Sequence, residues 1–292
     1  MGRPLLRPRR GDRRAALRGA PDRRRDGLRV DRNVDRPAAL RPRARGQRVV
    51  HDAVAPPHRG RARRRCGPAE AQAAGPAGGP RYNTSVTPVI LVTGFEPFGT
   101  FGVNPTEGLA KAVDGRRLGD GQVRSAVLPV HHAEAALRVG ALLAETHPAA
   151  VLHLGLAAER ARVALERVAV NVMEYEQPDN AGWRARGEPC VPGGPAAYFA
   201  TLPLEAIRQA LTADGIPAYV SHTAGTYLCN QTLYTTLHAV RSRSRAPRVG
   251  FIHVPLLPSM VAASGLEQPS MDFPLMLRAV EVALGVIAGD LA

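Results

Sequence analysis

Cys229 is the residue of this chain whose surroundings most favour covalent chemistry. It lies in the stretch SHTAGTYLCN at 221–230, after a short apolar run at 216–220 and before a segment with helical spacing. A cysteine at the start of a helix is close to free backbone N–H groups and to the positive end of the helix dipole. Both features lower the pKa of a thiol, so we expect Cys229 to be a nucleophile. The commoner role for an isolated cysteine is a buried structural one.

A thiol nucleophile needs a base, and His253 and Glu166 are the candidates that complete such a site. Imidazole can take up a proton near neutral pH, and a carboxylate can fix its tautomer and stabilise its charged form. We therefore predict a Cys–His–Glu arrangement, provided that the fold brings the three residues together. Alternatives stay open, because His253 could be a core histidine and Glu166 could pair with Arg167. Four other histidines could also serve as the base: His131, His132, His153 and His222.

The elements that must position these residues alternate between strands and helices. Apolar runs predict strands at 89–93, 123–130, 150–154, 218–220 and 249–254, and an extended segment at 163–172. Helical spacing predicts helices from 104 through 113 and at 133–146, 204–213, 230–242 and 270–288. This alternation predicts an α/β fold with a mainly parallel sheet covered on both faces. In such sheets the active site lies beyond the carboxyl ends of the strands, which is where we place the three residues.

The charge of the chain is concentrated in its first 85 residues. Residues 1–85 hold 23 arginines and 7 acidic residues, a net +16, whereas the other 207 residues hold 16 basic and 18 acidic residues, a net −2. Only Tyr82 of the 13 aromatic residues precedes residue 86. We expect 1–85 to be a disordered Arg/Pro/Ala/Gly-rich extension, because it cannot bury enough apolar surface to offset its chain entropy, and 86–292 to be one domain.

Three interpretations of residues 1–85 remain: a nucleic-acid-binding tail, a targeting extension, or sequence upstream of a true start at Val86. We favour the third, since acidic residues are scattered among the arginines and aromatic repeats are missing. No nucleic-acid partner is therefore expected. The three cysteines are widely spaced, with no CxxC pair, which disfavours a disulfide framework or a zinc site and favours a reducing compartment. No apolar run is long enough to span a membrane, so the expected location is cytoplasmic.

Several motifs together resemble the pyroglutamyl peptidase type I (pyrrolidone-carboxylate peptidase) family of cysteine peptidases. They are GFEPFG at 94–99 with NP at 104–105, GLA at 155–157, LERVAVN at 165–171, PDN at 178–180, AGTYLCN at 224–230 and GFIHVP at 250–255. The resemblance covers about residue 89 to the C-terminus. It implies a three-layer α/β/α sandwich, a catalytic triad of Cys229, His253 and Glu166, no metal or organic cofactor, and a homo-oligomer, commonly a tetramer.

The resemblance also implies the reaction and its substrate. Peptides with an N-terminal pyroglutamate (5-oxoproline) would be cleaved through a thioester on the cysteine. By resemblance, Phe95 and Phe98 flank the lactam ring, and main-chain groups near Leu156 and Leu228 bind its polar atoms. Asn104 belongs to the family motif near the site, although its position before Pro105 also predicts a helix N-cap.

Two positions depart from the family pattern. Glu176 stands where the family usually has an arginine that is thought to assist the oxyanion, and Leu156 stands where many members have glutamine. A carboxylate near a developing oxyanion is repulsive. The alternatives to an active peptidase are thus a weakly active or inactive homologue that binds pyroglutamyl ligands, and nucleic-acid binding through the basic N-terminal segment.

Overall fold

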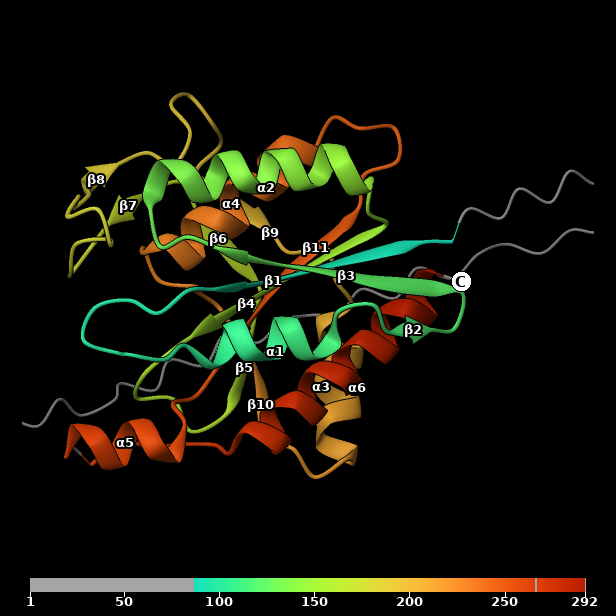
Figure 1. Cartoon of the computed structure of the whole chain (residues 1–292). Coiled ribbons are helices and arrows are strands. Elements are labelled where there is room, and N and C mark those ends of the chain that lie inside the picture. The colour runs from blue at the N-terminus through green and yellow to red at the C-terminus, as the bar shows by residue number, and fades with distance from the viewer. Residues whose placement is uncertain (1–86, 266, 292) are drawn as a thin grey trace, which may run out of the picture. The chain divides into compact units, whose positions relative to one another are not determined.

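The computed structural model describes residues 87–265 and 267–291 (Figure 1). Our predictions for residues 1–85, including a start at Val86, lie outside these ranges. The described part folds around a seven-stranded sheet in the order β10-β5-β11-β4-β1-β3-β2. Its strands are β1 (Val89–Phe95), β2 (Arg117–Leu118), β3 (Gly121–Leu128), β4 (Ala150–Leu156), β5 (Val163–Glu166), β10 (Ala218–Ser221) and β11 (Arg248–Val254).

The sheet is mixed but mostly parallel, as predicted. β1 pairs in parallel with β3 and β4, β4 with β11, and β5 with β10. Two pairs are antiparallel, the edge hairpin of β2 and β3 and the pairing of β5 with β11, which is second from the β10 edge. Strands β5 and β10 therefore run opposite to β11, which corrects our expectation that Glu166, Cys229 and His253 all follow strand ends at one edge. The runs at 163–166 and 218–221 are too short to indicate direction.

Helices cover both faces of the sheet, so the fold has three layers (Figure 1). On one face, α2 and α4 pack over a core that includes Leu91, Val151 and Phe251. On the other, α1, α3 and α6 pack over a core that includes Ile90, Leu152 and Ile252. Alternate residues of each strand thus belong to different cores, as the period of two requires. The helices are α1 (Pro105–Val113), α2 (His132–Thr146), α3 (Leu204–Ala213), α4 (Leu228–Val240), α5 (Pro258–Ser264) and α6 (Phe273–Leu291).

Some boundaries differ from the predicted ones. α4 begins at Leu228 rather than at residue 230, so Cys229 lies inside its first turn. α6 begins and ends three residues later than predicted, and the short helix α5 was not predicted. The extended segment at 163–172 is divided between β5 and β6 (Val168–Val170). Two small antiparallel pairs complete the fold, β6 with β9 (Ala197–Phe199) and β7 (Met173–Glu174) with β8 (Arg186–Glu188).

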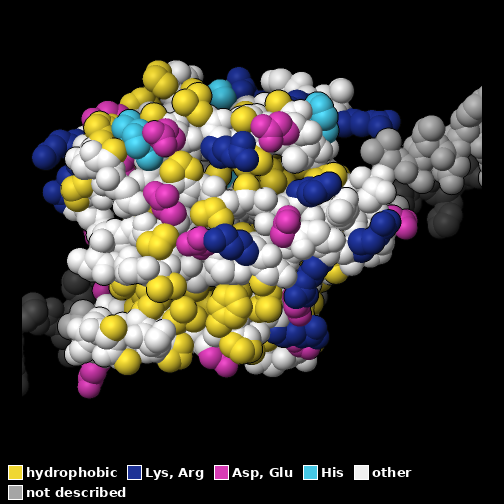
Figure 2. Space-filling model, viewed as in Figure 1, with side chains coloured by type: hydrophobic (Ala, Val, Ile, Leu, Met, Phe, Trp, Pro, Cys, Tyr) yellow, Lys and Arg dark blue, Asp and Glu magenta, His cyan; other side chains and the backbone are white. Residues whose placement is uncertain are grey.

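Charged side chains of both signs are interspersed on the face of the folded part shown in Figure 2. This agrees with the near-neutral composition of residues 86–292. No helix in the described ranges combines the length and apolarity that a bilayer crossing requires.

Candidate active site

The antiparallel join of β5 and β11 places Glu166 beside His253. In that register Glu166 lies opposite Phe251 and Ala164 opposite His253. Opposite residues of an antiparallel pair point to the same face of the sheet, so the side chains of Glu166 and His253 are diagonal neighbours on one face. His253 Nδ1 and Glu166 Oε1 are 2.7 Å apart, and both side chains are buried. If β5 ran parallel to β11, the residues of β5 that lie next to His253 would be different.

Glu166 is a buried carboxylate held at one oxygen. Its Oε1 also accepts a hydrogen bond from Arg160 Nη1 at 2.6 Å, whereas its Oε2 has no hydrogen-bond partner among the described residues. The Glu166 side chain is fully buried and the Arg160 side chain is 26% exposed. Arg160 therefore supplies the positive charge that a carboxylate in this position requires. Our alternative that Glu166 pairs with Arg167 is wrong, since the ion pair is made with Arg160.

Gly155 leaves the space that the His253 ring occupies. The two residues are direct neighbours on the parallel strands β4 and β11. A Cβ atom at residue 155 would lie 2.6 Å from the ring of Phe251 and 2.9 Å from Cδ2 of His253. The glycine of the GLA motif is thus explained by the close approach of two rings to the backbone.

Cys229 is the second residue of α4. Cys229 and His253 both line a cavity of about 650 Å³. The N-cap residue Tyr227 offers no side-chain hydrogen bond to the helix, and the first turn holds no acidic residue. The first N–H groups of α4 therefore lack the usual capping partner. Such groups can stabilise negative charge that develops near Cys229.

The pKa of Cys229 differs from our prediction. Burial, with a smaller contribution from the Glu166 carboxylate, raises the pKa of the Cys229 thiol to about 12. Arg160 and the backbone N–H of Cys229 act in the opposite direction and are outweighed. With its pKa raised in this way, the thiol needs a base to lose its proton at neutral pH.

The first turn of α4 is fixed by two side chains that the sequence did not single out as site residues. Asn230 accepts a hydrogen bond from Val170 N and donates to the carbonyls of Val170 and Val172. Gln231 accepts from the hydroxyl of Tyr175 at 2.6 Å and donates to the carbonyl of His132 at 2.8 Å. These contacts attach the helix start to β6, to the segment after β7 and to α2, so Cys229 has a fixed position.

All five residues predicted to bind the substrate line the cavity: Phe95, Phe98, Asn104, Leu156 and Leu228. Asn104 is also the N-cap of α1, as predicted, because its Oδ1 accepts from Thr106 N at 3.1 Å. Its Nδ2 donates to the carbonyl of Glu96, which holds the loop before α1 against the strand end. The lining includes further residues that we did not predict, notably Phe101, Glu174, Gln177 and Tyr227. Glu176, the departure from the family pattern, also lines the cavity.

The competing histidines lie away from the cavity. His153 is fully buried between hydroxyls, with Nδ1 2.7 Å from Thr93 and Nε2 3.0 Å from Thr236, and burial lowers its pKa to about 3. His222 is exposed and does not line the cavity. Among the described histidines only His253 lines the cavity with Cys229.

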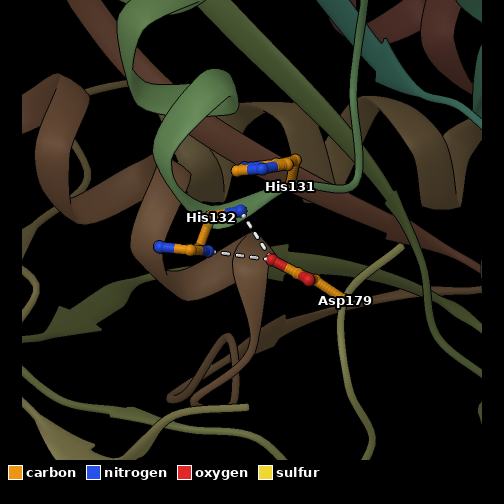
Figure 3. Close-up of side chains that lie close together, drawn as sticks. All are labelled: His131, His132 and Asp179. Atoms are coloured by element: carbon orange, nitrogen blue, oxygen red, sulfur yellow. Dashed lines mark hydrogen bonds and ion pairs between the residues drawn. The ribbon is translucent and has the colours of Figure 1, made fainter. Parts of the chain in front are cut away.

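His131 and His132 form a cluster with Asp179 at the start of α2 (Figure 3). Figure 2 shows histidine side chains gathered at this end of the helix. The cluster has metal-ligand chemistry, but its ligand atoms already have hydrogen-bond partners. Asp179 Oδ2 accepts from His132 N at 3.0 Å and lies 2.9 Å from His132 Nδ1, and Oδ1 accepts from Ala181 N and Trp183 N. His131 Nδ1 caps α2. The cluster thus fastens the 178–183 loop to α2.

Comparison with known proteins gives a consistent result. The family model described as pyroglutamyl peptidase matches residues 89–290. The pyrrolidone-carboxylate peptidase of Pyrococcus furiosus is 44% identical over 205 residues, which are 69% of this chain and 99% of the relative. The enzyme of that name from Deinococcus radiodurans is 44% identical over 208 residues, 70% of this chain and 95% of the relative.

Solved structures agree with the fold described above. A structure of a mutant pyrrolidone carboxyl peptidase from Pyrococcus furiosus superposes with a TM-score of 0.68 at 43% identity, covering 70% of this chain and all of the other. The pyrrolidone carboxyl peptidase from Thermococcus litoralis has a TM-score of 0.68 at 39% identity, covering 70% of this chain and 94% of the other.

Proposed function

The chain belongs to the pyroglutamyl peptidase family and removes N-terminal pyroglutamate from peptides, and we propose that Cys229, His253 and Glu166 catalyse this reaction. The observation that carries the proposal is that Cys229 and His253 line one cavity while Glu166 holds the far side of the imidazole. Cys229 is the nucleophile, His253 the general base and acid, and Glu166 the residue that orients His253.

The first half of the reaction forms a thioester. His253 Nε2 takes the proton of the Cys229 thiol as the sulfur attacks the pyroglutamyl carbonyl carbon. Because the pKa of the thiol is raised, the sulfur needs His253 to remove its proton. The carbonyl oxygen becomes an oxyanion beside the backbone N–H of Cys229. The intermediate then breaks its C–N bond, and the imidazolium gives its proton to the leaving amine.

The second half releases the product. A water molecule enters the space that the amine has left, and His253 takes one of its protons as the oxygen attacks the thioester carbon. The C–S bond breaks, the sulfur recovers the proton from His253, and free pyroglutamate leaves. Throughout, Glu166 Oε1 accepts the hydrogen bond of Nδ1–H, so the basic Nε2 faces the cavity and the charged imidazolium is stabilised.

The pyroglutamyl ring is an uncharged lactam, and the cavity wall suits it. Phe95, Phe98, Leu156 and Leu228 provide an apolar surface for the ring. As the family resemblance implies, main-chain groups near the last two would bind its N–H and C=O. Asn104 acts by holding the loop that carries Phe98. The tetrameric assembly and the cytoplasmic location implied by the family resemblance remain our predictions, and light scattering on the purified protein tests the first.

The proposed triad is tested with a chromogenic pyroglutamyl amide. We expect thiol-dependent turnover by the wild type and a loss of at least about a thousandfold in kcat for Cys229→Ala and for His253→Ala. Cys190→Ala is the matched control, because Cys190 is half-buried and does not line the cavity. Wild-type protein that binds the amide without turnover would favour the alternative of an inactive homologue.

A further inference from the structure

Two carboxylates on the cavity wall are not needed for the pyroglutamyl ring. Glu174 and Glu176 line the cavity with exposed side chains, and no lysine or arginine lines it in the described ranges. The pyroglutamyl group has no positive charge, because its amine is closed into a lactam. A cation that these carboxylates bind must therefore come from a later part of the substrate.

The backbone around the two glutamates is fixed against the loop that precedes Cys229. Glu174 N donates to the carbonyl of Thr226 at 3.1 Å, and the Thr226 hydroxyl donates back to the carbonyl of Glu174 at 2.7 Å. Tyr175, between the two, is buried and bonded to Gln231 in α4. The two glutamates on either side of this buried residue are both exposed and both line the cavity.

The glutamates lie where the catalytic cavity meets a second one. This outer cavity, of about 490 Å³, shares Glu174, Glu176 and Thr226 with the catalytic cavity, and its other residues include Arg184 and Arg186. The phenylalanines, Cys229 and His253 line only the inner cavity. A peptide whose ring occupies the apolar part and whose carbonyl reaches Cys229 can continue past the glutamates into the outer cavity.

Neither carboxylate makes an ion pair with any residue in the described part of the chain. By contrast, the surface glutamates Glu107 and Glu205 are each paired with a basic side chain of their own helix. Although Arg186 is the register partner of Glu174 in the β7–β8 pair, the two are not ion-paired, so both carboxylates can bind a substrate cation.

We propose that Glu174 and Glu176 select peptides in which a lysine or arginine directly follows the pyroglutamate. This inference rests on the proposed function and names the substrate class of the same cavity. The cation lies between the two carboxylates, while the ring and the scissile bond keep the positions described above. Because both carboxylates are exposed, the preference over a neutral residue is about three- to tenfold in kcat/KM.

The test compares three matched substrates, pyroglutamyl-lysine amide, pyroglutamyl-glutamine amide and pyroglutamyl-glutamate amide. We expect kcat/KM in the order lysine, glutamine, glutamate for the wild type at about 20 mM salt, and a smaller spread at about 500 mM, where the charges are screened. In the double variant Glu174→Gln, Glu176→Gln the lysine-to-glutamine ratio falls to near one.

A double variant elsewhere provides the control for net charge. Asp120→Asn with Glu145→Gln also removes two negative charges, from exposed positions that do not line either cavity, and should keep the wild-type ratio. A wild-type ratio near or below one, or a ratio that survives in the Glu174→Gln, Glu176→Gln variant, would overturn the inference. No turnover of any of the three substrates would instead refute the proposed function, on which the inference depends.

Discussion

Replacing Arg160 by methionine removes the cation that holds the carboxylate of Glu166. In the wild type, Oε1 of this fully buried side chain is bonded at 2.6 Å to Arg160 and at 2.7 Å to His253, and Oε2 is unpaired. Breaking a buried ion pair by removing one partner costs about 3–5 kcal/mol. The Arg160 side chain is 26% exposed, so water replaces part of the lost interaction, and we expect the free energy of unfolding to fall by about 1–3 kcal/mol.

The same change is expected to lower activity. Arg160 and His253 bond the same oxygen of Glu166, so removing the Arg160 contact leaves this carboxylate, and through it the His253 ring, less firmly oriented. We therefore expect kcat to fall about tenfold in Arg160→Met, with KM little changed. Arg160→Lys keeps the charge and should restore part of the stability and of kcat.

The measurements are urea unfolding and the kcat and KM of a pyroglutamyl amide, for the wild type and both variants. A purely structural role for Arg160 would lower the stability and leave the kcat of the folded enzyme unchanged. Wild-type stability together with a wild-type kcat in Arg160→Met would refute the reasoning altogether.

Two further substitutions and one chemical modification have defined expected outcomes. Gly155→Ala places a methyl group 2.9 Å from the His253 ring, and the displaced imidazole should lower kcat by about a hundredfold, measured on the amide with circular dichroism to check folding. Burial raises the pKa of Asp179, but hydrogen bonds from His132, Trp183 and Ala181 outweigh this effect and hold the pKa below its usual range. The ionised carboxylate therefore stabilises the folded state above its unfolded-state pKa of about 4, and this stabilisation is lost as the pH falls through its pKa in the folded state. Asp179→Asn should be less stable than wild type at pH 7, with a deficit that shrinks below about pH 4 in urea unfolding. Because the pKa of Cys229 is raised to about 12, its alkylation by iodoacetamide should accelerate steadily from pH 6 to 9, and a plateau near pH 6 would contradict this.

Most of the fold could be predicted from the sequence because each element has a local signal. The helix at 204–213 has the predicted bounds, and Asn104 caps α1 as its type and position before a proline indicated. The direction of β5 could not be predicted, since a buried strand of four residues has the same pattern in a parallel and in an antiparallel pair. That direction is what places Glu166 next to His253.

The parts of the site that depend on contacts between distant segments were also missed. Arg160 has no local feature that distinguishes it from other surface arginines, and Tyr175 gains its role only by meeting Gln231, which is 56 residues away. The pKa of Cys229 was predicted in the wrong direction because the helix start is visible in the sequence and the burial of the thiol is not. The three residues that we propose as the triad could nevertheless be identified from the family motifs in which they lie.

The role of Cys229 is tested most directly by trapping the acyl-enzyme. Wild-type protein is mixed with a pyroglutamyl amide, quenched in acid within the first turnover, digested and analysed by mass spectrometry, with Cys190 as the internal comparison. We predict one pyroglutamyl group, attached as a thioester to the peptide that contains Cys229 and absent from the peptide that contains Cys190. Undiminished turnover by Cys229→Ala, or a pyroglutamyl group on another residue, would contradict the proposed mechanism.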